Sequence, residues 1–257
     1  MAVESPSRGI STTALYCYGI VEAGAGVRQP GAGLGREPVE PVRHGKLAAL
    51  TSAVPRVRVR ARRNDLLTHF DVLGNAFERG TVLPMRFGIV FDDEDSLVAE
   101  LLRPRHDELV GLLRELRDRV ELRVTAHYRE QAILAEIVRE NERVASLREA
   151  TRAQASAHPF LVELGELVSK ELQARCRRDA QALLRALRRV ALRYELDEQP
   201  IEYQVLRGSF LVERRRVDSF DHALDAFATG HRETIDVKLV GPLPPHSFVE
   251  LTHGETR

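Results

Sequence analysis

The chain has 257 residues, of which 43% are hydrophobic and 30% are charged, and its 38 basic residues balance 38 acidic ones. This length suffices for one large domain or two ordinary ones, and the composition predicts a soluble globular protein with ample core. A formal net charge of zero gives no reason to expect nucleic acid or an anionic membrane surface as the main partner.

Targeting signals and redox features are few. The polar residues 1–13 lack the apolar centre of a secretory signal and predict a disordered tail. No apolar run approaches the ~20 residues that a membrane span needs. The only cysteines, Cys17 and Cys176, fall in an expected core strand and on a helix stripe, which indicates buried thiols in a reducing compartment. We therefore expect a cytoplasmic protein without a membrane span.

Residues 14–119 predict an N-terminal α+β domain. Strong β-formers predict three strands, at 14–21, 39–44 and 47–54. The last two form a hairpin, because only Gly45 and Lys46 separate them. The helix that follows is expected to bury one apolar face, made of Leu66, Phe70, Leu73 and Phe77.

Residues 80–95, GTVLPMRFGIVFDDED, predict a buried strand that departs from two local rules. Pro84 removes a ladder donor, and Arg86 places a charge among apolar residues, where an unpaired charge is costly. We therefore expect Arg86 to have an acidic or carbonyl partner, as in a structural ion pair. The acidic run at the end of this stretch starts a helix, which must kink or restart at Pro104.

Residues 120–240 predict a ferredoxin-like domain with a long helical hairpin inserted at about 129–196. After a strand at 121–128, the first arm carries a moderate apolar stripe of Ile133, Ile137, Val144 and Leu147. A break near His158 and Pro159 separates it from a cleaner stripe of Leu172, Cys176, Ala180, Leu183, Leu187, Val190 and Tyr194. Two such arms around one short break are typical of an antiparallel, coiled-coil-like hairpin.

The remaining elements complete the split βαβ order. They are strands at 201–207 and 210–216 that turn at Gly208 and Ser209, a helix capped by Asp218 that buries Phe220, Leu224 and Phe227, and a strand at 234–240. Residues 241–257 begin GPLPPHSFVE, and the prolines predict an extended C-terminal arm with Phe248 as its anchor. The predicted fold class is α+β throughout.

No pattern in the chain predicts an active site. The glycine-rich loop at 22–38 contains prolines where a nucleotide site needs a helix to begin. The nine histidines include no pair at helical spacing and lie far from the cysteines, so no metal-ligand cluster is formed. Cys17 and Ser209 lack a nearby base motif. We therefore predict no catalytic residue, no cofactor and no metal.

Four motifs occur in order along the chain: LYCYGIV, TVLPMRFGIVFDDED, ELGELVSKEL and IDVKLVGPLPPHSFVEL. Together they resemble the gas vesicle protein L/F family (GvpL/GvpF), and the match extends from Ala14 to Leu251. By position, the family pattern falls on two blocks: Leu83, Pro84, Arg86, Phe87 and Gly88, and then Gly241, Pro242, Pro245, Ser247 and Phe248. His246 stands where the family commonly has an aromatic residue.

The resemblance implies a cytoplasmic, gas-vesicle-associated accessory protein that is not an enzyme and that binds the hydrophobic shell protein or other accessory proteins. The two blocks are then candidates for family signature or partner contact. From the charged hairpin we expect the binding surface on sheet edges or hairpin faces of the C-terminal half. The alternatives are a ferredoxin-like protein that binds RNA or a small ligand, or an enzyme with an unrecognised site. RNA binding has little support, because Tyr203 is the only aromatic residue of the strands at 201–207 and 234–240.

Overall fold

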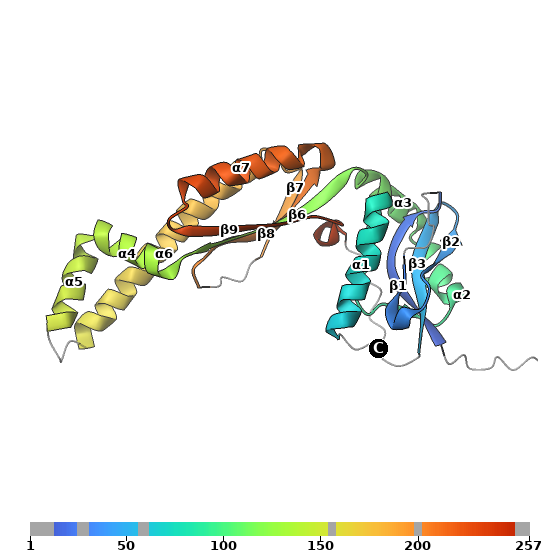
Figure 1. Cartoon of the computed structure of the whole chain (residues 1–257), viewed down its shortest axis with the longest axis horizontal. Helices are drawn as coiled ribbons and strands as arrows, with labels where there is room; N and C mark the ends of the chain where they lie inside the picture. Colours follow the sequence, from blue (N-terminus) through green and yellow to red (C-terminus); the bar gives the residue numbers. More distant parts are fainter. Residues whose placement is uncertain (1–12, 25–30, 56–61, 154–157, 198–201, 250–257) are drawn as a thin grey trace, which may run out of the picture. The chain divides into compact units, whose positions relative to one another are not determined.

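The computed structural model describes residues 13–24, 31–55, 62–153, 158–197 and 202–249. The chain divides into two compact units, a first unit of Met1–Arg119 with Leu243–Arg257 and a second unit of Val120–Pro242. Each unit holds one sheet with helices packed on it (Figure 1). The predicted α+β fold class is therefore confirmed. The tail predicted at 1–13 lies outside the described residues, except for Thr13.

The first unit is built around β1 (Thr13–Glu22). β1 pairs antiparallel with β3 (Leu47–Pro55) on one side and with β4 (Val82–Pro84) and β5 (Val90–Phe91) on the other. β3 also pairs with β2 (Glu40–His44). The predicted hairpin of β2 and β3 is confirmed. β1 is rich in β-branched and aromatic residues and β3 in Ala and Leu, and both strands are buried over most of their length. Tyr16 and Tyr18 of β1 are fully enclosed.

Residues 80–95 do not form the single buried strand that the sequence predicts. They form two short strands, β4 (Val82–Pro84) and β5 (Val90–Phe91), which pair with different parts of β1. Pro84 ends β4, which is a position where a strand tolerates the loss of a donor. The chain between the two strands makes a turn, and the signature residues Arg86, Phe87 and Gly88 lie in it.

Helix α1 (Arg63–Arg79) contacts β1 and β4. Its buried residues are His69, Val72, Leu73 and Phe77. The prediction that Phe70 belongs to this face is wrong, because 51% of Phe70 is exposed. The buried stripe runs through His69, and the next residue is rotated by about 100° around the helix axis. Phe70 therefore lies on the surface beside the core.

The helical region after β5 restarts at Pro104, as predicted. α2 (Glu94–Leu97) begins at Asp93, whose side chain accepts the Ser96 N–H at 2.8 Å. A π-helical turn, η2 (Val98–Leu102), follows, and α3 (His106–Glu115) begins after the proline. α3 contacts β1, β3 and β4 and covers the first sheet with Leu109 and Leu113.

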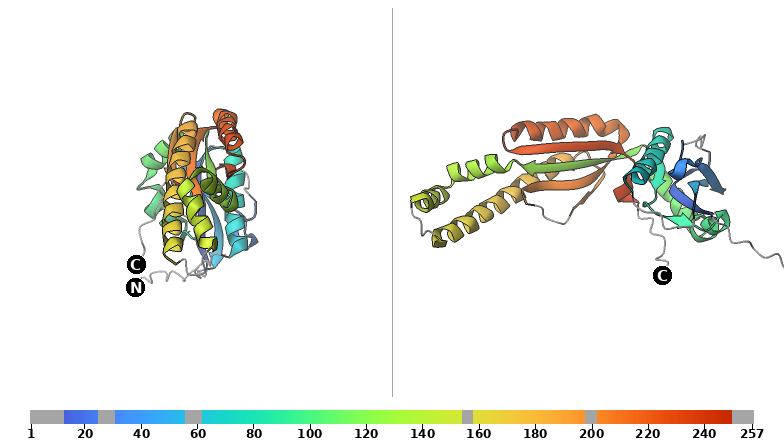
Figure 2. Two further views of the ribbon diagram at one scale, coloured as in Figure 1. Left: turned by 90° about the vertical axis from the view of Figure 1, so that its left-hand side faces the viewer. Right: turned by 60° about the horizontal axis from the view of Figure 1, so that its bottom comes forward.

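The second unit has the strand order β7-β8-β6-β9. The strands are β6 (Arg119–Tyr128), β7 (Arg193–Leu196), β8 (Gln204–Glu213) and β9 (Ile235–Leu243). The first and third strands of the unit are central and the other two form the edges, as in a split βαβ arrangement. α6 (His158–Leu187) and α7 (Val217–Gly230) contact each other and β8 (Figure 2). The ferredoxin-like prediction is confirmed.

The inserted hairpin consists of α4 (Glu130–Glu140), α5 (Glu142–Ala153) and α6 (His158–Leu187). α4 and α5 run beside α6, and α5 lies beyond the end of the unit's sheet (Figures 1 and 2). The first arm bends at Asn141, which the sequence does not predict. The Asn141 side chain accepts the N–H groups of Arg143 and Val144, both at 3.1 Å, and so starts a new helix. Tyr194, expected at the end of the second arm, lies in β7.

The predicted hairpin around Gly208 and Ser209 is wrong. β8 continues through both residues, and its antiparallel neighbour is β7, with Leu196 opposite Gly208. A Cβ atom on Gly208 would lie only 2.7 Å from the Glu195 carbonyl oxygen. The glycine therefore permits the close approach of a neighbouring strand and does not mark a turn.

Two further expectations near the end of the chain need correction. α7 buries Phe220, Leu224 and Phe227 as predicted, but Asp218 does not cap it, because the helix already begins at Val217. β9 continues through Gly241 and Pro242, which are joined by a cis peptide bond. The arm expected from 241 therefore starts after β9, and a short helical turn, η4 (His246–Phe248), places Phe248 in the core of the first unit.

Candidate functional site

The first signature block forms a turn that β1 holds at both ends. The Met85 N–H donates to the Tyr18 carbonyl at 2.9 Å, and the Cys17 N–H donates to the Ile89 carbonyl at 3.0 Å. Gly88 has a φ of +95°, a region that residues with a Cβ atom rarely adopt. The sequence thus places a glycine where the turn requires one. Between the two anchors Arg86 is exposed, and Phe87 is half-buried with its ring 5.9 Å from that of Tyr16.

His69 of α1 lies beneath this turn and links it to the sheet. Its Nδ1 lies 2.9 Å from the Tyr16 hydroxyl, which also accepts the Gly88 N–H at 3.1 Å. Since the Tyr16 oxygen accepts from Gly88, its own proton is available for His69 Nδ1, and the other ring nitrogen carries the imidazole proton. The pKa of His69 is lowered to about 4, because burial and the nearby His246 lower it more than a hydrogen bond to the Met85 backbone raises it. His69 is therefore neutral at pH 7.

Both signature blocks meet around His69. The ring of Phe87 lies 5.6 Å from that of His69, and the ring of Phe70 lies 5.5 Å from it. The ring of Phe70 also lies 5.6 Å from that of His246, in the second block. Pro245 and Phe248 are buried beside His246 in the chain, and Ser247 is half-buried. The fold thus brings together residues that are far apart in the sequence.

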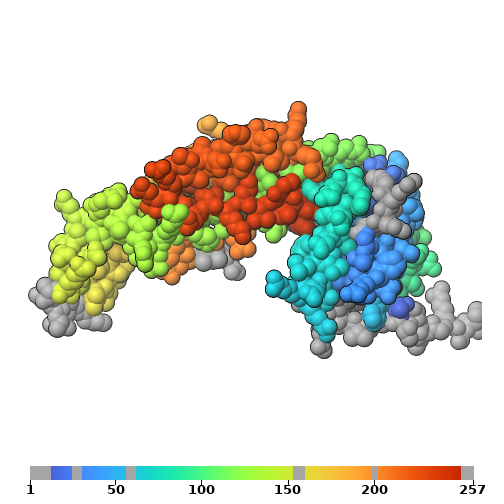
Figure 3. All heavy atoms as spheres, viewed as in Figure 1, coloured from blue at the N-terminus to red at the C-terminus, as the bar shows by residue number. Residues whose placement is uncertain are grey.

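An apolar surface covers this meeting point. Leu67 and Phe70 of α1 are each 51% exposed and lie one helical turn apart. Phe87 and His246 are half-buried beside Phe70. We call Leu67, Phe70, Phe87 and His246 the α1 patch, and Figure 3 shows α1, in cyan, along the surface of the first unit.

The other signature residues fall into different settings. Leu83 and Pro84 are buried in β4 and belong to the core. Gly241 lies in the second unit on β9, where a Cβ atom would come within 2.8 Å of the Glu121 carbonyl oxygen, and Pro242 follows it. The second block is therefore divided between the two units, and His246, in the part that belongs to the first unit, contacts Phe70 of the α1 patch.

The buried setting predicted for Arg86 is wrong. Arg86 is exposed, and it forms no ion pair with the residues that the structure describes. Its neighbours Met85 and Leu83 are buried as the pattern indicates. The chain leaves the sheet directly after Met85, so the cation lies in solvent next to the α1 patch and needs no desolvation.

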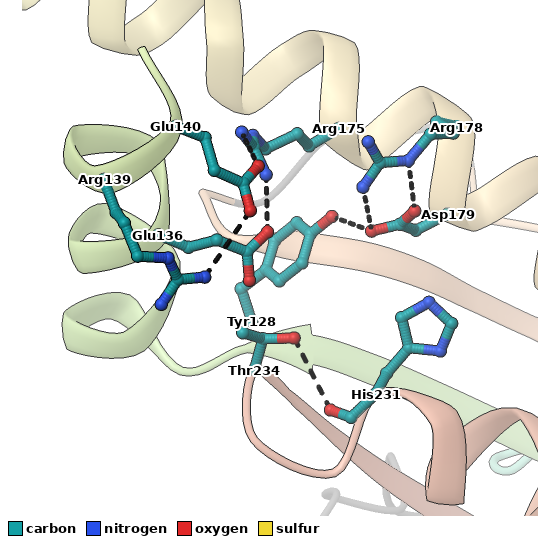
Figure 4. Close-up of polar contacts among 9 residues, drawn as sticks. All are labelled: Tyr128, Glu136, Arg139, Glu140, Arg175, Arg178, Asp179, His231 and Thr234. Atoms are coloured by element: carbon teal, nitrogen blue, oxygen red, sulfur yellow. Dashed lines mark hydrogen bonds and ion pairs between the residues drawn. The ribbon is translucent and has the colours of Figure 1, made fainter. Parts of the chain in front are cut away.

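A second polar cluster, the hairpin-base network, ties α4 and α6 to β6 (Figure 4). The Tyr128 hydroxyl donates to Asp179 Oδ2, and Arg178 Nε lies 2.8 Å from Asp179 Oδ1. Burial and the Asp179 carboxylate both raise the pKa of Tyr128. The phenol therefore stays protonated and acts as a donor.

Arg175 supplies the other half of the hairpin-base network. Its guanidinium donates to Glu136 and, at 2.8 Å, to Glu140, although Arg175 itself is buried on α6 (Figure 4). Glu140 also lies 3.5 Å from the exposed Arg139. A buried cation between two carboxylates fixes the separation of α4 and α6. Within the described ranges, no three His, Cys, Asp or Glu side chains are grouped as a metal site would need.

The comparisons with known proteins agree over nearly the whole chain. The model of the family "Gas vesicle synthesis protein GvpL/GvpF" matches residues 14–250. This chain belongs to that family. Gas vesicle protein F of Streptomyces sp. (strain CB03234) is 36% identical over 241 residues, which cover 91% of this chain and 99% of the relative. Gas vesicle protein L of the same strain is 30% identical, and the matched region covers 93% of this chain and 94% of that relative.

Solved structures of GvpF share the fold. The crystal structure of GvpF from Anabaena sp. PCC7120 superposes with a TM-score of 0.82 at 22% identity, covering 94% of this chain and all (100%) of that one. GvpF from Microcystis aeruginosa gives a TM-score of 0.75 at 21% identity, with 93% and 99% covered. A GvpL/GvpF protein thus keeps this two-part α+β architecture, and the chain has an accessory role in gas vesicles.

Sequence reasoning found the signature blocks but missed the residues that join them. His69 and Tyr16 lie outside both blocks, and Phe70 was assigned to the core. A polar aromatic residue at a core position of a helix was the available signal for His69, because a buried imidazole requires hydrogen-bond partners. None of the helices that the structure describes combines the length and the apolarity that crossing a bilayer requires.

Proposed function

We propose that this GvpL/GvpF protein acts in gas vesicle assembly by binding the hydrophobic shell protein, other accessory proteins, or both, through the α1 patch. The observation that carries the proposal is the exposure of Leu67 and Phe70 directly beside the two blocks that carry the family pattern. An exposed apolar cluster over a rigid base is a typical site of protein contact.

The chemistry of the α1 patch supports an apolar partner. His69 beneath it is neutral at pH 7 because its pKa is lowered to about 4. Two charged residues adjoin the α1 patch in the chain, Asp71 after Phe70 and Arg86 before Phe87, and both are exposed. A partner that covers Leu67 and Phe70 therefore desolvates no buried charge, and the two charges at the rim favour a partner with polar groups at its margin.

We also propose that this role requires no catalysis by the chain. Burial raises the pKa of the Cys17 thiol to about 12, so the thiolate is scarce at neutral pH. The binding role would be carried out in the cytoplasm, on or near the forming vesicle. It needs neither a cofactor nor nucleic acid.

The test is co-expression of the full chain with the major gas vesicle shell protein and with each accessory protein, followed by affinity pull-down at moderate salt. The variant Leu67→Ser with Phe70→Ser should reduce retention of the bound partner by roughly tenfold or more, because two apolar side chains no longer contribute to binding. Circular dichroism should match that of the wild type, since both residues are exposed.

A matched control uses Leu161→Ser with Val162→Ser, two exposed apolar residues of α6 on the hairpin. Retention by this control should equal that of the wild type. Loss of retention in the control, with normal binding by the α1 variant, would place the contact on the hairpin, as expected from the sequence. Normal retention by both variants would reject an apolar contact at either surface.

A further inference from the structure

The second unit's sheet ends in a short strand with uncovered apolar side chains. Among the described strands, β7 pairs only with β8. Leu192 and Tyr194 are each 42% exposed, and Leu196 is 41% exposed. Their spacing of two places them on one side of the strand. Single apolar residues on a surface are ordinary, but a row of them along a free strand edge favours pairing with another strand.

Backbone groups also point away from β8 at this edge. The Asp197 N–H donates to the Arg207 carbonyl at 3.0 Å. The residues of β7 stay in the same antiparallel register with β8, from Leu196 opposite Gly208 to Arg193 opposite Leu211. Hydrogen-bonded positions alternate in an antiparallel pair, so the odd-numbered residues of β7 direct their backbone groups at β8. The N–H and carbonyl groups of Tyr194 and Leu196 therefore face the free edge.

Three of the other described edge strands carry a proline, and the remaining one, β5, is only Val90–Phe91. Pro41 lies in β2, Pro84 ends β4, and Pro242 lies in β9. Proline lacks an N–H donor, and its presence at an edge discourages the addition of another strand. β7 has the sequence RYEL and lacks this protection. Its two charged residues, Arg193 and Glu195, restrict the way in which it can pair.

We propose that β7 pairs antiparallel with β7 of a second copy of this chain, about a twofold axis at Tyr194. In this register Arg193 of each copy lies opposite Glu195 of the other. Leu192 precedes β7 and its N–H donates to the Leu211 carbonyl at 2.8 Å, so it faces Leu196 of the other copy with its side chain only. Opposite charges across neighbouring strands stabilise pairing, and like charges destabilise it. A twofold axis generates each favourable pair twice, as an isologous interface requires.

The same charges disfavour the competing registers. Moving the twofold axis by one residue places Glu195 opposite Glu195. A parallel, in-register pairing places Arg193 opposite Arg193 and Glu195 opposite Glu195. The register centred on Tyr194 brings no like charges together. The charges of β7 therefore favour pairing with a second copy of the chain, in the antiparallel register centred on Tyr194.

A strand of this length buries less area than the ~1,200–2,000 Å² of a stable interface. The dimer is therefore weak and reversible, with a Kd on the order of 100 µM. Sedimentation equilibrium of the full chain from about 10 µM to about 1 mM covers this range. The wild-type chain should change from monomer to dimer across it.

Charge exchange tests the pairing. R193E and E195R each place like charges at both symmetric positions, so each should weaken self-association roughly tenfold or more. An equimolar mixture of R193E and E195R should associate about as tightly as the wild type, because each Glu then faces an Arg. K238E, the same charge change at an exposed position of β9, should leave the Kd unchanged.

A cross-link locates the axis. In the proposed register the two residues at 194 are direct neighbours with Cα atoms about 5.5 Å apart, which a disulfide can span. Y194C should form a covalent dimer under mild oxidation, and K238C should remain monomeric. The natural Cys17 is buried and Cys176 is half-buried, so the wild type gives the background.

Several outcomes would overturn the proposal. They are a wild type that stays monomeric at all concentrations, single variants that associate like the wild type, and a mixture that is no tighter than its components. Self-association abolished by Phe70→Ser but not by R193E would place the contact on the α1 patch. A monomeric chain whose β7 takes up a strand of another protein would assign the edge to a different occupant.

Discussion

His69 connects the two signature blocks although it belongs to neither. It receives a hydrogen bond from Tyr16, contacts Phe87, and lies beside Phe70, which in turn contacts His246. A phenylalanine at 69 could fill the space but could not bond to Tyr16 and Met85. The imidazole therefore fixes the position of the turn at 86–88 through polar contacts beneath an apolar surface.

The depressed pKa of His69 predicts a loss of stability in mild acid. The pKa is about 4 in the folded chain against 6.5 as the ordinary value. The unfolded state therefore binds the proton more readily, and the contribution of His69 is complete above pH 6.5 and is lost as the pH falls toward 4. Between pH 7 and 4.5 the wild type should lose roughly 2 kcal/mol more unfolding free energy than His69→Gln.

Urea unfolding at several pH values measures this difference. Glutamine can accept from Tyr16 and donate to the Met85 backbone while it remains neutral, so the variant keeps the hydrogen bonds and removes the titration. The carboxyl groups of Glu108, Glu140 and Asp236 have lowered pKa values. Their protonation at low pH reduces the unfolding free energy of the wild type and of the variant equally. Parallel curves for wild type and variant would contradict a buried neutral His69.

Arg175 and Arg139 provide a matched pair for the hairpin-base network, because both approach Glu140. Arg175→Ala should cost about 3–5 kcal/mol of unfolding free energy, since it leaves the carboxylates of Glu136 and Glu140 without their buried partner. Arg139→Ala removes an exposed pair and should cost at most about 0.5 kcal/mol. Chemical denaturation of both variants at pH 7 measures the two losses of unfolding free energy. Similar losses would contradict the conclusion that Arg175 is the buried partner of both carboxylates.

At the scale of elements, the bend at Asn141 divides the first hairpin arm into two helices. The Asn141 amide starts α5 and also donates to Glu171 of α6 at 2.9 Å. Asn141→Ala should cost about 1–2 kcal/mol, because a helix cap and a contact between the arms are lost together. Asn141→Asp should keep the cap but lose the donor to Glu171.

Hydrogen exchange locates the effect of Asn141. The alanine variant should show faster exchange at the first amides of α5, and the aspartate variant should protect them as the wild type does. Equal exchange in all three proteins would mean that the bend does not depend on the side chain at this position.

Element types were predictable where one periodic pattern dominates. β1, the β2–β3 hairpin, the restart at Pro104 and the buried face of α7 follow from alternation, proline chemistry and helical spacing. The turn assigned to Gly208 failed because glycine serves both turns and close strand contacts, and only the position of β7 distinguishes the two. The bend at Asn141 could not be predicted, because the capping role of the side chain depends on the backbone conformation at that one residue.

At the scale of the whole molecule, the sequence was enough to identify the signature blocks. It was not enough to predict that they lie close together in the fold. Nothing local shows that His246 lies near Phe70, because the contact joins residues on opposite sides of the second unit in the chain. Phe70 and Arg86 were both misassigned for the same reason. Each lies one residue beyond a buried position, and a rotation or a turn at that point exchanges core for surface.

The division of the chain also sets an order for its synthesis. The first unit consists of residues on both sides of Val120–Pro242, and it includes the buried Phe248 and Val249. A ribosome makes these residues only after the whole second unit, which is contiguous and can complete its sheet by itself. The second unit can therefore fold first. His69 and Phe70 can contact His246 only after the C-terminal segment has been synthesised. Until that segment emerges, the nascent chain carries an incomplete first core and an α1 patch that lacks one side.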